Sequence, residues 1–268
     1  MEGDKKFLID VGLKDLPFPF TVASRAKPTG QPTIGNISIN IRIMHEFETV
    51  WIDTFIQLVH QHRDMIATST LSANILDYVR AFKGAPVRID HRYPFFVEKL
   101  TPVSKERCLV QYRCTYSVMA SSMQKPKIRF KIEIPALTTF PHTTLFLHDR
   151  LIAQLSVVVV EVESPGEVYP EDLVELVDTH ALAPVYSYLT PEDQDYIIQK
   201  THRESKTSPA MVEEIQDELD RNRDIRWSSV KCSNYGMLHP YSTLIGTEKS
   251  GLVPFSEISR ELEREFGF

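Results

Sequence analysis

Histidines near the middle and the end of the chain are the side chains best suited to proton transfer. His142 and His148 flank one segment, and His239 lies far downstream, where a strand or a turn is expected. Imidazole titrates near neutral pH and is a competent metal ligand, so His142 and His239 could form an acid–base pair or part of a metal site. Tyr241 could donate a hydrogen bond nearby or simply pack against its neighbours. We expect His142, His239 and Tyr241 to be catalytic, against the alternative that they are structural or exposed to solvent.

A short acidic run, PEDQ at residues 191–194, could bind a polar ligand. The amide of Gln194 presents an acceptor beside donors, and it therefore suits a ligand with a carbonyl beside an N–H group. The same run could be only the acidic start of a helix, with Gln194 on its solvated face. Arg25 could hold an anionic group with two hydrogen bonds, or it could form a structural salt bridge. We expect Gln194, Asp193, Glu192 and Arg25 to contact the substrate.

The composition excludes several classes of function. The chain has 268 residues, with 30 Lys and Arg against 36 Asp and Glu, so its net charge of −6 provides no cationic surface for a nucleic-acid backbone. The longest purely apolar stretch, residues 157–160, is too short to cross a membrane. The 3 cysteines form no Cys-x-x-Cys pair, and they support neither a disulfide framework nor a cysteine zinc site. We therefore expect a cytoplasmic protein without nucleic-acid or membrane partners.

Hydrophobic patterns predict the elements that position these residues. The first half is expected to contain strands over residues 18–23 and 34–43, helices over 48–63 and 70–82, and strands over 87–99 and 108–120. The second half repeats this order, with strands over 127–135 and 153–163, helices over 169–180 and 209–223, and strands over 225–234 and 238–246. Two tandem ββααββ modules, residues 1–123 and 124–268, predict an α+β fold with antiparallel sheets layered by helices. Such sheets leave open edges, so we expect an oligomer.

Several segments occur together in the order found in one enzyme family. Residues 10–16 (DVGLKDL) and 24–26 (SRA) form the first group, residues 93–99 (YPFFVEK) and 101–104 (TPVS) the second, and residues 184–186 (PVY) the third. Together they resemble the type IB GTP cyclohydrolases, relatives of the tunnel-fold enzymes that act on purines and pterins. The resemblance covers about residues 8–246, and its specificity lies in the common order of the segments.

The resemblance implies a bimodular tunnel fold that assembles into a homotetramer with ligand pockets between subunits. Enzymes of this family open the imidazole ring of GTP with a metal-activated water and form dihydroneopterin triphosphate. A bound metal lowers the pKa of its water and so supplies hydroxide at neutral pH. By this resemblance, the partner of the chain is a small heterocyclic ligand.

The family's metal ligands have no counterparts at the matching positions of this chain. The Cys-Pro-Cys segment of the family falls on Phe140-Pro141-His142, and the histidine of its His-Asn-Gln-Arg segment falls on Ile152. Neither phenylalanine nor isoleucine can bind a metal ion. The early Gly-Thr-His-Met-Ser-Arg-Phe motif falls on residues 49–55, which lack its polar chemistry. We therefore expect no resident metal or other cofactor.

Two further family positions are also changed. The glutamate of the Arg-Pro-Asp-Glu turn, which works on the purine, falls on Gln194 in an ungapped match, or on Glu192 or Asp193 if the match shifts. Of the paired histidines in the family's His-Asn-His segment, only one is kept in His239-Pro240-Tyr241. Both changes favour a ligand site that differs from that of the family.

Three functional hypotheses follow from the resemblance and its departures. The first, which we prefer, is a divergent enzyme that transforms a purine- or pterin-like heterocycle without the metal, with His239 or His142 moving protons. The second is a non-catalytic protein that keeps the oligomer and binds a ligand or a partner. The third is retained GTP cyclohydrolase activity, in which His142 replaces the missing thiolate.

Overall fold

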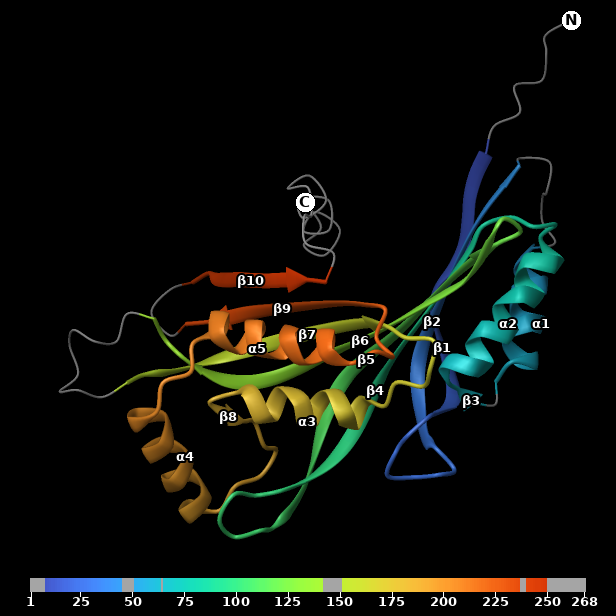
Figure 1. Ribbon diagram of the computed structural model, residues 1–268. Coiled ribbons are helices and arrows are strands. Elements are labelled where there is room, and N and C mark those ends of the chain that lie inside the picture. Colours follow the sequence, from blue (N-terminus) through green and yellow to red (C-terminus); the bar gives the residue numbers. More distant parts are fainter. Residues whose placement is uncertain (1–7, 45–50, 64, 142–150, 237–239, 250–268) are drawn as a thin grey trace, which may run out of the picture.

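The structure is a computed structural model that describes residues 8–44, 51–63, 65–141, 151–236 and 240–249 (Figure 1). The strands of its sheet are β1 (Leu8–Val22), β2 (Gln31–Met44), β3 (Met65–Ile66), β4 (Val87–Leu100), β5 (Arg107–Ser121), β6 (Gln124–Thr139), β7 (Ala153–Glu163), β8 (Ala183–Pro184), β9 (Trp227–Tyr235) and β10 (Ser242–Glu248). The helices among the described residues are α1 (Trp51–Gln61), α2 (Thr68–Ala81), α3 (Pro170–His180), α4 (Pro191–Arg203) and α5 (Ser208–Arg221).

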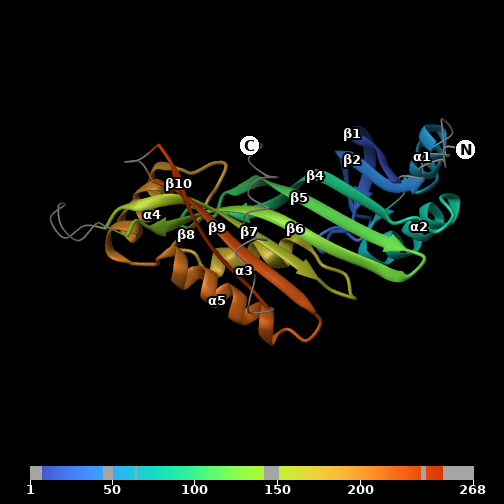
Figure 2. The same ribbon diagram turned by 90° about the horizontal axis from the view of Figure 1, so that it is seen from above.

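One continuous sheet runs through both halves of the chain. Its strands follow the order β10-β9-β7-β6-β5-β4-β2-β1-β3, and the short β8 pairs with β6. Neighbouring strands are antiparallel, apart from the parallel pair of β1 and β3. Helices α1 and α2 lie at one end of the sheet, and α3 and α5 lie against the strands of the other half (Figures 1 and 2). The predicted α+β fold with antiparallel strands and covering helices is confirmed.

The two halves meet at a tight hairpin. Strands β5 and β6 pair along most of their length, and the hairpin between them closes at Ser121 and Gln124. The predicted module boundary at residues 123 and 124 therefore falls inside this hairpin. The division into two modules stays a prediction, because the sheet itself is continuous across that point.

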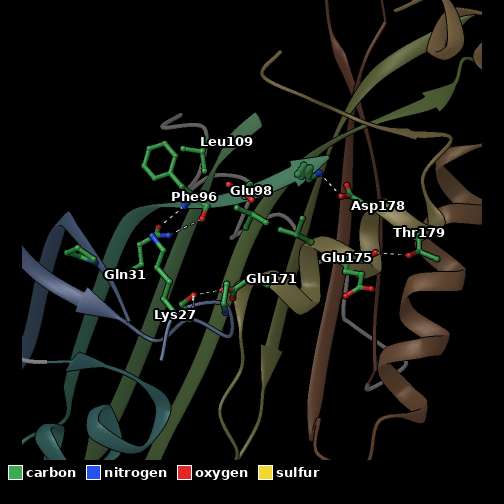
Figure 3. Close-up of a pocket in the computed structure, with 15 residues that line it drawn as sticks. Lys27, Gln31, Phe96, Glu98, Leu109, Glu171, Glu175, Asp178 and Thr179 are labelled. Carbon is green, nitrogen blue, oxygen red and sulfur yellow. Dashed lines mark hydrogen bonds and ion pairs between the residues drawn. The ribbon is translucent and has the colours of Figure 1, made fainter. Parts of the chain in front are cut away.

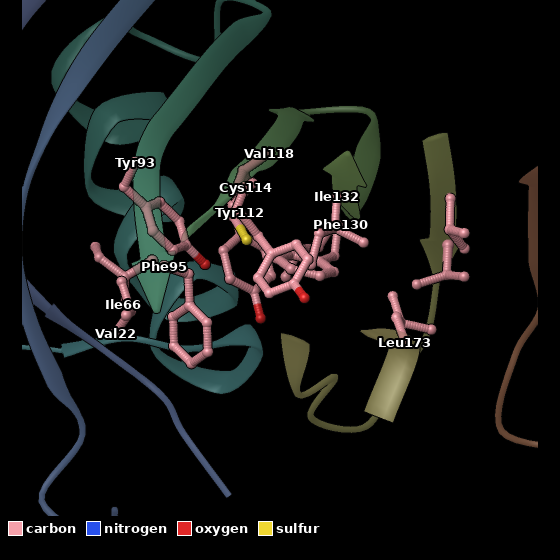
Figure 4. Packing of buried hydrophobic residues seen from close by; sticks show 14 of the residues in the cluster. Val22, Ile66, Tyr93, Phe95, Tyr112, Cys114, Val118, Phe130, Ile132 and Leu173 are labelled. Atoms are coloured by element: carbon pink, nitrogen blue, oxygen red, sulfur yellow. The ribbon is translucent and has the colours of Figure 1, made fainter. Parts of the chain in front are cut away.

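Alternating burial explains why these segments form strands. In β5, every second residue from Cys108 to Ala120 is buried, while the residues between them are more exposed. This period of two places one face of the strand against the helices and the other toward solvent. The buried side chains of both halves form one cluster, part of which Figure 4 shows around Tyr93, Phe130 and Leu173. Burying each large apolar side chain of this kind contributes about 1.5–3 kcal/mol.

The second half contains a helix that the hydrophobic pattern did not predict. The apolar residues of α4 form no buried stripe, since Tyr196 and Ile198 are exposed and only Asp193 and Thr201 of the helix are buried. The helix is defined instead by its start, where Thr190 and Asp193 form a capping box ahead of Pro191. Among its described residues, the second half thus has three helices where two were expected.

Several predicted element ends were wrong. Strand β1 begins at Leu8, ten residues before the expected start, because it pairs with β2 across an irregularity between Leu13 and Leu16. The predicted strand over residues 238–246 begins at Ser242, and residues 237–239 lie outside the described residues. No helix in the described part of the chain is long and apolar enough to span a membrane.

Gly35 of β2 marks a close approach of strands that a side chain would obstruct. A methyl group at this position would lie 2.5 Å from the carbonyl oxygen of Arg92 and 2.6 Å from the ring of Phe20. We predict that Gly35→Ala lowers the free energy of unfolding by about 2 kcal/mol, because backbone and ring would have to move apart. Urea denaturation measures this loss.

Gly166 provides the matched control for this substitution. It lies in an exposed turn, and a methyl group there would meet only the Ser164 hydroxyl at 3.8 Å. Gly166→Ala should change stability by less than about 0.5 kcal/mol. Equal stability of the two variants would contradict the packing described here.

Candidate functional site

Phe140 and Ile152, the two residues predicted to fall at metal-ligand positions of the family, lie side by side. The pairing of β6 with β7 ends at Thr139 and Ala153, and the backbone N–H of Phe140 then donates to the carbonyl of Ile152 at 2.8 Å. Both residues are half-buried. The ring of Phe140 also packs close to Gly236, where a methyl group would lie 3.0 Å from it. Phe140 and Ile152 are therefore adjacent in the fold, and both of their side chains are hydrocarbon.

The described residues at this place do not fit a metal ion. Neither Phe140 nor Ile152 carries a ligand atom, and metal sites need nitrogen, sulfur or oxygen donors. Over the described ranges, no group of three or more His, Cys, Asp or Glu side chains is arranged to hold a metal. His142, His148 and His239 lie outside the described residues.

A chain of buried polar side chains runs next to Phe140 and Ile152. Gln154 Nε2 donates to Thr138 Oγ1 at 3.2 Å, and the Thr138 and Ser156 hydroxyls are 2.7 Å apart. Ser156 Oγ donates to Asn234 Oδ1 at 2.8 Å, and Asn234 Nδ2 donates to Ser208 Oγ at 2.9 Å. All five side chains are buried. The chain joins β6, β7, β9 and α5, and it fixes their relative positions because each buried polar group has a partner.

Asp193 fastens α4 to the first half of the chain. Its Oδ1 accepts the backbone N–H groups of Val103 and Ser104 at 2.8 and 3.0 Å. Its Oδ2 accepts the Ser104 hydroxyl at 2.6 Å and the Thr190 hydroxyl at 2.7 Å. The side chain is fully buried, and both oxygens are occupied by protein donors. A ligand could bind this carboxylate only by displacing those donors.

These hydrogen bonds control the ionisation of Asp193. Burial alone would raise the pKa of the carboxyl group, but the hydrogen bonds from Ser104, Thr190 and Val103 outweigh that effect. The pKa of Asp193 consequently lies well below its ordinary value of 3.8. The carboxylate stays ionised in the folded protein at neutral pH.

The other predicted substrate contacts are spread over the molecule. Gln194 and Glu192 are exposed on the first turn of α4, and Gln194 Nε2 donates to the carbonyl of Leu189 at 3.3 Å. Arg25 follows β1 and pairs with Asp172 at 2.5 Å. Figure 1 places α4 and the β1–β2 connection at opposite ends of α3, so one subunit does not bring Arg25 beside Gln194.

Tyr241 lies just before β10 and is exposed. The structure does not describe its predicted partners His142 and His239. The catalytic roles of these three residues stay predictions.

His202, which contacts Leu151 next to Ile152, was not singled out from the sequence. Its Nδ1 contacts the carbonyl oxygen of Leu151 at 2.8 Å, and the Leu151 N–H donates to the His202 carbonyl at 3.3 Å. A carbonyl only accepts, so Nδ1 carries the proton and Nε2 remains as the atom that can take one up. No local sequence motif indicates this contact, because it joins the end of α4 to the residues just before β7.

A buried ion pair lies at a second location, between β4 and α3. Lys99 Nζ is 2.5 Å from Asp178 Oδ2, and the Lys99 side chain is only 9% exposed. The ammonium also lies 5.4 Å from the ring centre of Tyr112 and 5.8 Å from that of Tyr186. Burial raises the pKa of Asp178 although Lys99 opposes it, and burial raises the pKa of Tyr186 to about 12. Lys99 is the last residue of the YPFFVEK segment, but the sequence did not indicate that it pairs with Asp178.

The family model described as type I GTP cyclohydrolase FolE2 matches residues 4–244 of the chain. The GTP cyclohydrolase FolE2 of Citrifermentans bemidjiense is 26% identical over 240 residues, which cover 90% of this chain and 89% of that protein. The FolE2 protein of Syntrophus aciditrophicus is 27% identical over 251 residues, covering 93% and 97% of the two chains.

Among solved structures, the chain is similar to urate oxidases of the tunnel fold. The urate oxidase of Bacillus sp. TB-90 superposes with a TM-score of 0.55 at 9% identity, covering 90% of this chain and 99% of that one. A hyperthermostable variant of the same enzyme gives a TM-score of 0.55, covering 91% and 100%. At such low identity the likeness concerns the fold alone, and it confirms the predicted tunnel fold.

We predict that Asp193→Asn lowers the melting temperature by roughly 5–10 °C at pH 7, because an amide NH₂ would face donors that need an acceptor. The folded pKa of Asp193 is depressed, so its stabilisation is complete above pH 3.8 and is lost as the pH falls through the folded pKa. The difference between the two proteins should therefore shrink below pH 4. Thermal melts followed by circular dichroism measure both effects.

Asp195→Asn is the matched control, because Asp195 is an exposed residue of the same helix. It should melt within about 1–2 °C of the unchanged protein. If both substitutions had the same small effect, Asp193 would not hold α4 in place.

Proposed function

The chain belongs to the family of type I GTP cyclohydrolases called FolE2, and we propose that it transforms a purine- or pterin-like heterocycle without the family's metal. The observation that carries this proposal is the contact between Phe140 and Ile152. The two residues that we match to metal ligands are neighbours, and neither side chain can bind an ion. In this proposal the fold is kept while the chemistry of the site is changed.

In this proposal the chain's own groups replace the work of a bound ion. Gln194, with Glu192 beside it, binds the edge of the ring, and Asp193 holds that turn in place through its contacts with Ser104. His239 or His142 transfers protons, and Tyr241 donates a hydrogen bond to the reacting ring. Positioned acid and base groups in a site that excludes water can contribute large rate factors without a Lewis acid.

The geometry of His202 adds this residue to the groups that we propose transfer protons. Its imidazole is held by the Leu151 carbonyl with Nε2 left to accept a proton. It reaches the region from α4, the helix that also carries Gln194 and Glu192. His202 is therefore a further proton acceptor at the Phe140 end of the sheet.

The proposal includes a homotetramer in which sites form between subunits. Arg25 belongs to the β1–β2 connection and Gln194 to α4, and these two segments lie at opposite ends of α3 in Figure 1, so a shared site needs Arg25 from a second copy. Open sheet edges support such an assembly: in the described part of the chain, β3 covers β1 only at Thr21 and Val22, and β10 ends the sheet. A cytoplasmic location is part of the same proposal.

Retained GTP cyclohydrolase activity is the second candidate. The match over residues 4–244 and the FolE2 relatives that align over about nine-tenths of the chain favour it. In this case His142 would supply the ligand that Phe140 lacks, and a metal ion held there would lower the pKa of its bound water. A non-catalytic protein that only binds the heterocycle is the remaining alternative.

Product analysis with and without a chelator separates these candidates. The purified protein is incubated with GTP, neopterin or a urate-like oxopurine, with either EDTA or added zinc and manganese, and products are identified by mass spectrometry. We expect a new product from one of the heterocycles that forms equally well in EDTA. Thermal melts with each compound should show stabilisation by the ligand that reacts.

Two outcomes would decide against this proposal. Dihydroneopterin triphosphate that forms from GTP only without EDTA would establish the retained activity. Stabilisation by a heterocycle without any product would establish a binding protein. Loss of the new product in His202→Gln, with unchanged thermal stabilisation by the ligand, would separate proton transfer by His202 from a structural role.

A further inference from the structure

His180, the last residue of α3, lies between two carboxylates of α5. Its Nδ1 is 3.0 Å from Glu214 Oε2, and its Nε2 is 2.8 Å from Glu218 Oε2. The two glutamates lie one turn apart on α5, and both therefore belong to the same face of that helix. The His180 side chain is only 19% exposed. The imidazole thus joins the end of α3 to α5 through both of its nitrogens.

These two contacts require the charged form of the imidazole. An ionised carboxylate accepts hydrogen bonds and cannot donate them, so each ring nitrogen needs a hydrogen to bind its partner. Neutral imidazole carries one N–H group and can therefore keep only one of the two bonds. Imidazole is the side chain that ordinarily changes its charge between pH 5 and 8. The number of hydrogen bonds between α3 and α5 consequently depends on the pH in this range.

Lys206, in the connection between α4 and α5, belongs to the same cluster. Its Nζ contacts Glu214 Oε2 at 2.5 Å, the oxygen that also faces His180 Nδ1. The hydrogen bonds from Lys206 and His180 hold the pKa of the Glu214 carboxyl below its ordinary value of 4.5. When His180 loses a proton, Glu214 still has Lys206 as a partner. Glu218, whose side chain is 56% exposed, can turn to water instead.

The other charged side chains of α3 and α5 near this point have partners of their own or face elsewhere. Glu175 and Asp178 of α3 line a groove beside β4, where Asp178 pairs with Lys99 at 2.5 Å (Figure 3). On α5, Asp217 pairs with Arg221 at 4.0 Å. Strand β6 packs against α3, and the buried side chains of its second half are uncharged, namely Ile132, Ile134, Ala136 and Thr138. The two glutamates of α5 are thus the acidic groups that contact the imidazole.

We propose that His180 is a proton-operated clasp between α3 and α5, which is closed by the charged imidazole and released from Glu218 when the imidazole loses a proton. Because both contacts favour the charged form, the stability that they contribute is complete below about pH 6 and is lost as the pH rises. The clasp is separate from the reaction proposed above and does not depend on it.

The clasp also reaches the end of β6. The Thr139 N–H donates to the Lys206 carbonyl at 2.8 Å, and the Lys206 N–H donates to Thr139 Oγ1 at 2.8 Å. Lys206 is therefore fixed to the sheet by its backbone and to Glu214 by its side chain. Through Glu214, the imidazole is connected to the residue that precedes Phe140.

A double-mutant cycle at two pH values tests the clasp. The cycle consists of the unchanged protein, His180→Gln, Glu218→Gln and the variant with both substitutions. At about pH 6, Glu218→Gln should lower the melting temperature by about 1–3 °C in the unchanged background and by less than ~0.5 °C in the His180→Gln background. At about pH 8.5, the first difference should fall to less than half. Glutamate is ionised at both pH values, so the imidazole is the group of this cycle that titrates between them.

Glu213→Gln is the matched control, because Glu213 is an exposed residue of the same helix and the substitution removes the same charge. It should have an equal effect on the melting temperature at both pH values. The proposal would be overturned if Glu218→Gln had the same effect at both pH values, or the same effect with and without His180.

Hydrogen exchange locates the release. The Ala181 N–H donates to the Val177 carbonyl at 2.9 Å and so closes the last turn of α3. At about pH 6, this N–H should exchange at least ~2-fold faster in His180→Gln than in the unchanged protein, and at the same rate in Glu213→Gln. Equal exchange in His180→Gln and the unchanged protein would show that the imidazole does not fasten α3.

Discussion

The structure at the end of the sheet that holds Phe140 and Ile152 depends on the register of β6 against β7. Pairing from Phe130 with Val162 to Thr139 with Ala153 brings Phe140 next to Ile152. The same register places Thr138 and Ser156 in contact, which starts the polar chain that reaches Asn234. A shift of one residue would send every side chain of a strand to the opposite face. The contact between Phe140 and Ile152 and the chain of buried polar side chains beside it therefore both follow from the same strand register.

A single carboxylate links that end of the molecule to the first half of the chain. Asp193 starts α4 and also holds the β4–β5 connection through Val103 and Ser104. The same connection follows Lys99, which pairs with Asp178 on α3. Helices α3 and α4 are thus fastened to β4 and its connection by the ionised side chains of Asp178 and Asp193, whose removal leaves unmet donors or charges. This arrangement positions α4 and its exposed Gln194 relative to the sheet.

Sequence patterns predicted the parts of the fold that depend on hydrophobic periodicity. The alternation in β5 and the apolar stripe of α5 are of this kind, and both elements occur where expected. A helix start at residues 191–194, with Gln194 on its solvated face, was one of the alternatives and is confirmed. The extent of α4 was not predicted, because its stability comes from the cap at Thr190 and from Asp193, which leave little periodic signal. That Phe140 and Ile152 fall at metal-ligand positions of the family stays a prediction, whereas His202 and Asn234 were not singled out because they act through contacts distant in sequence.

Zinc binding by the unchanged protein and by Phe140→Cys/Ile152→His tests the central claim most directly. Both proteins are equilibrated with zinc and desalted, and the retained metal is measured by mass spectrometry. If hydrocarbon side chains occupy a former metal position, the double variant retains zinc and the unchanged protein does not, because thiolate and imidazole restore two ligands. One tightly held zinc ion per subunit in the unchanged protein, lost on His142→Ala, would contradict the account.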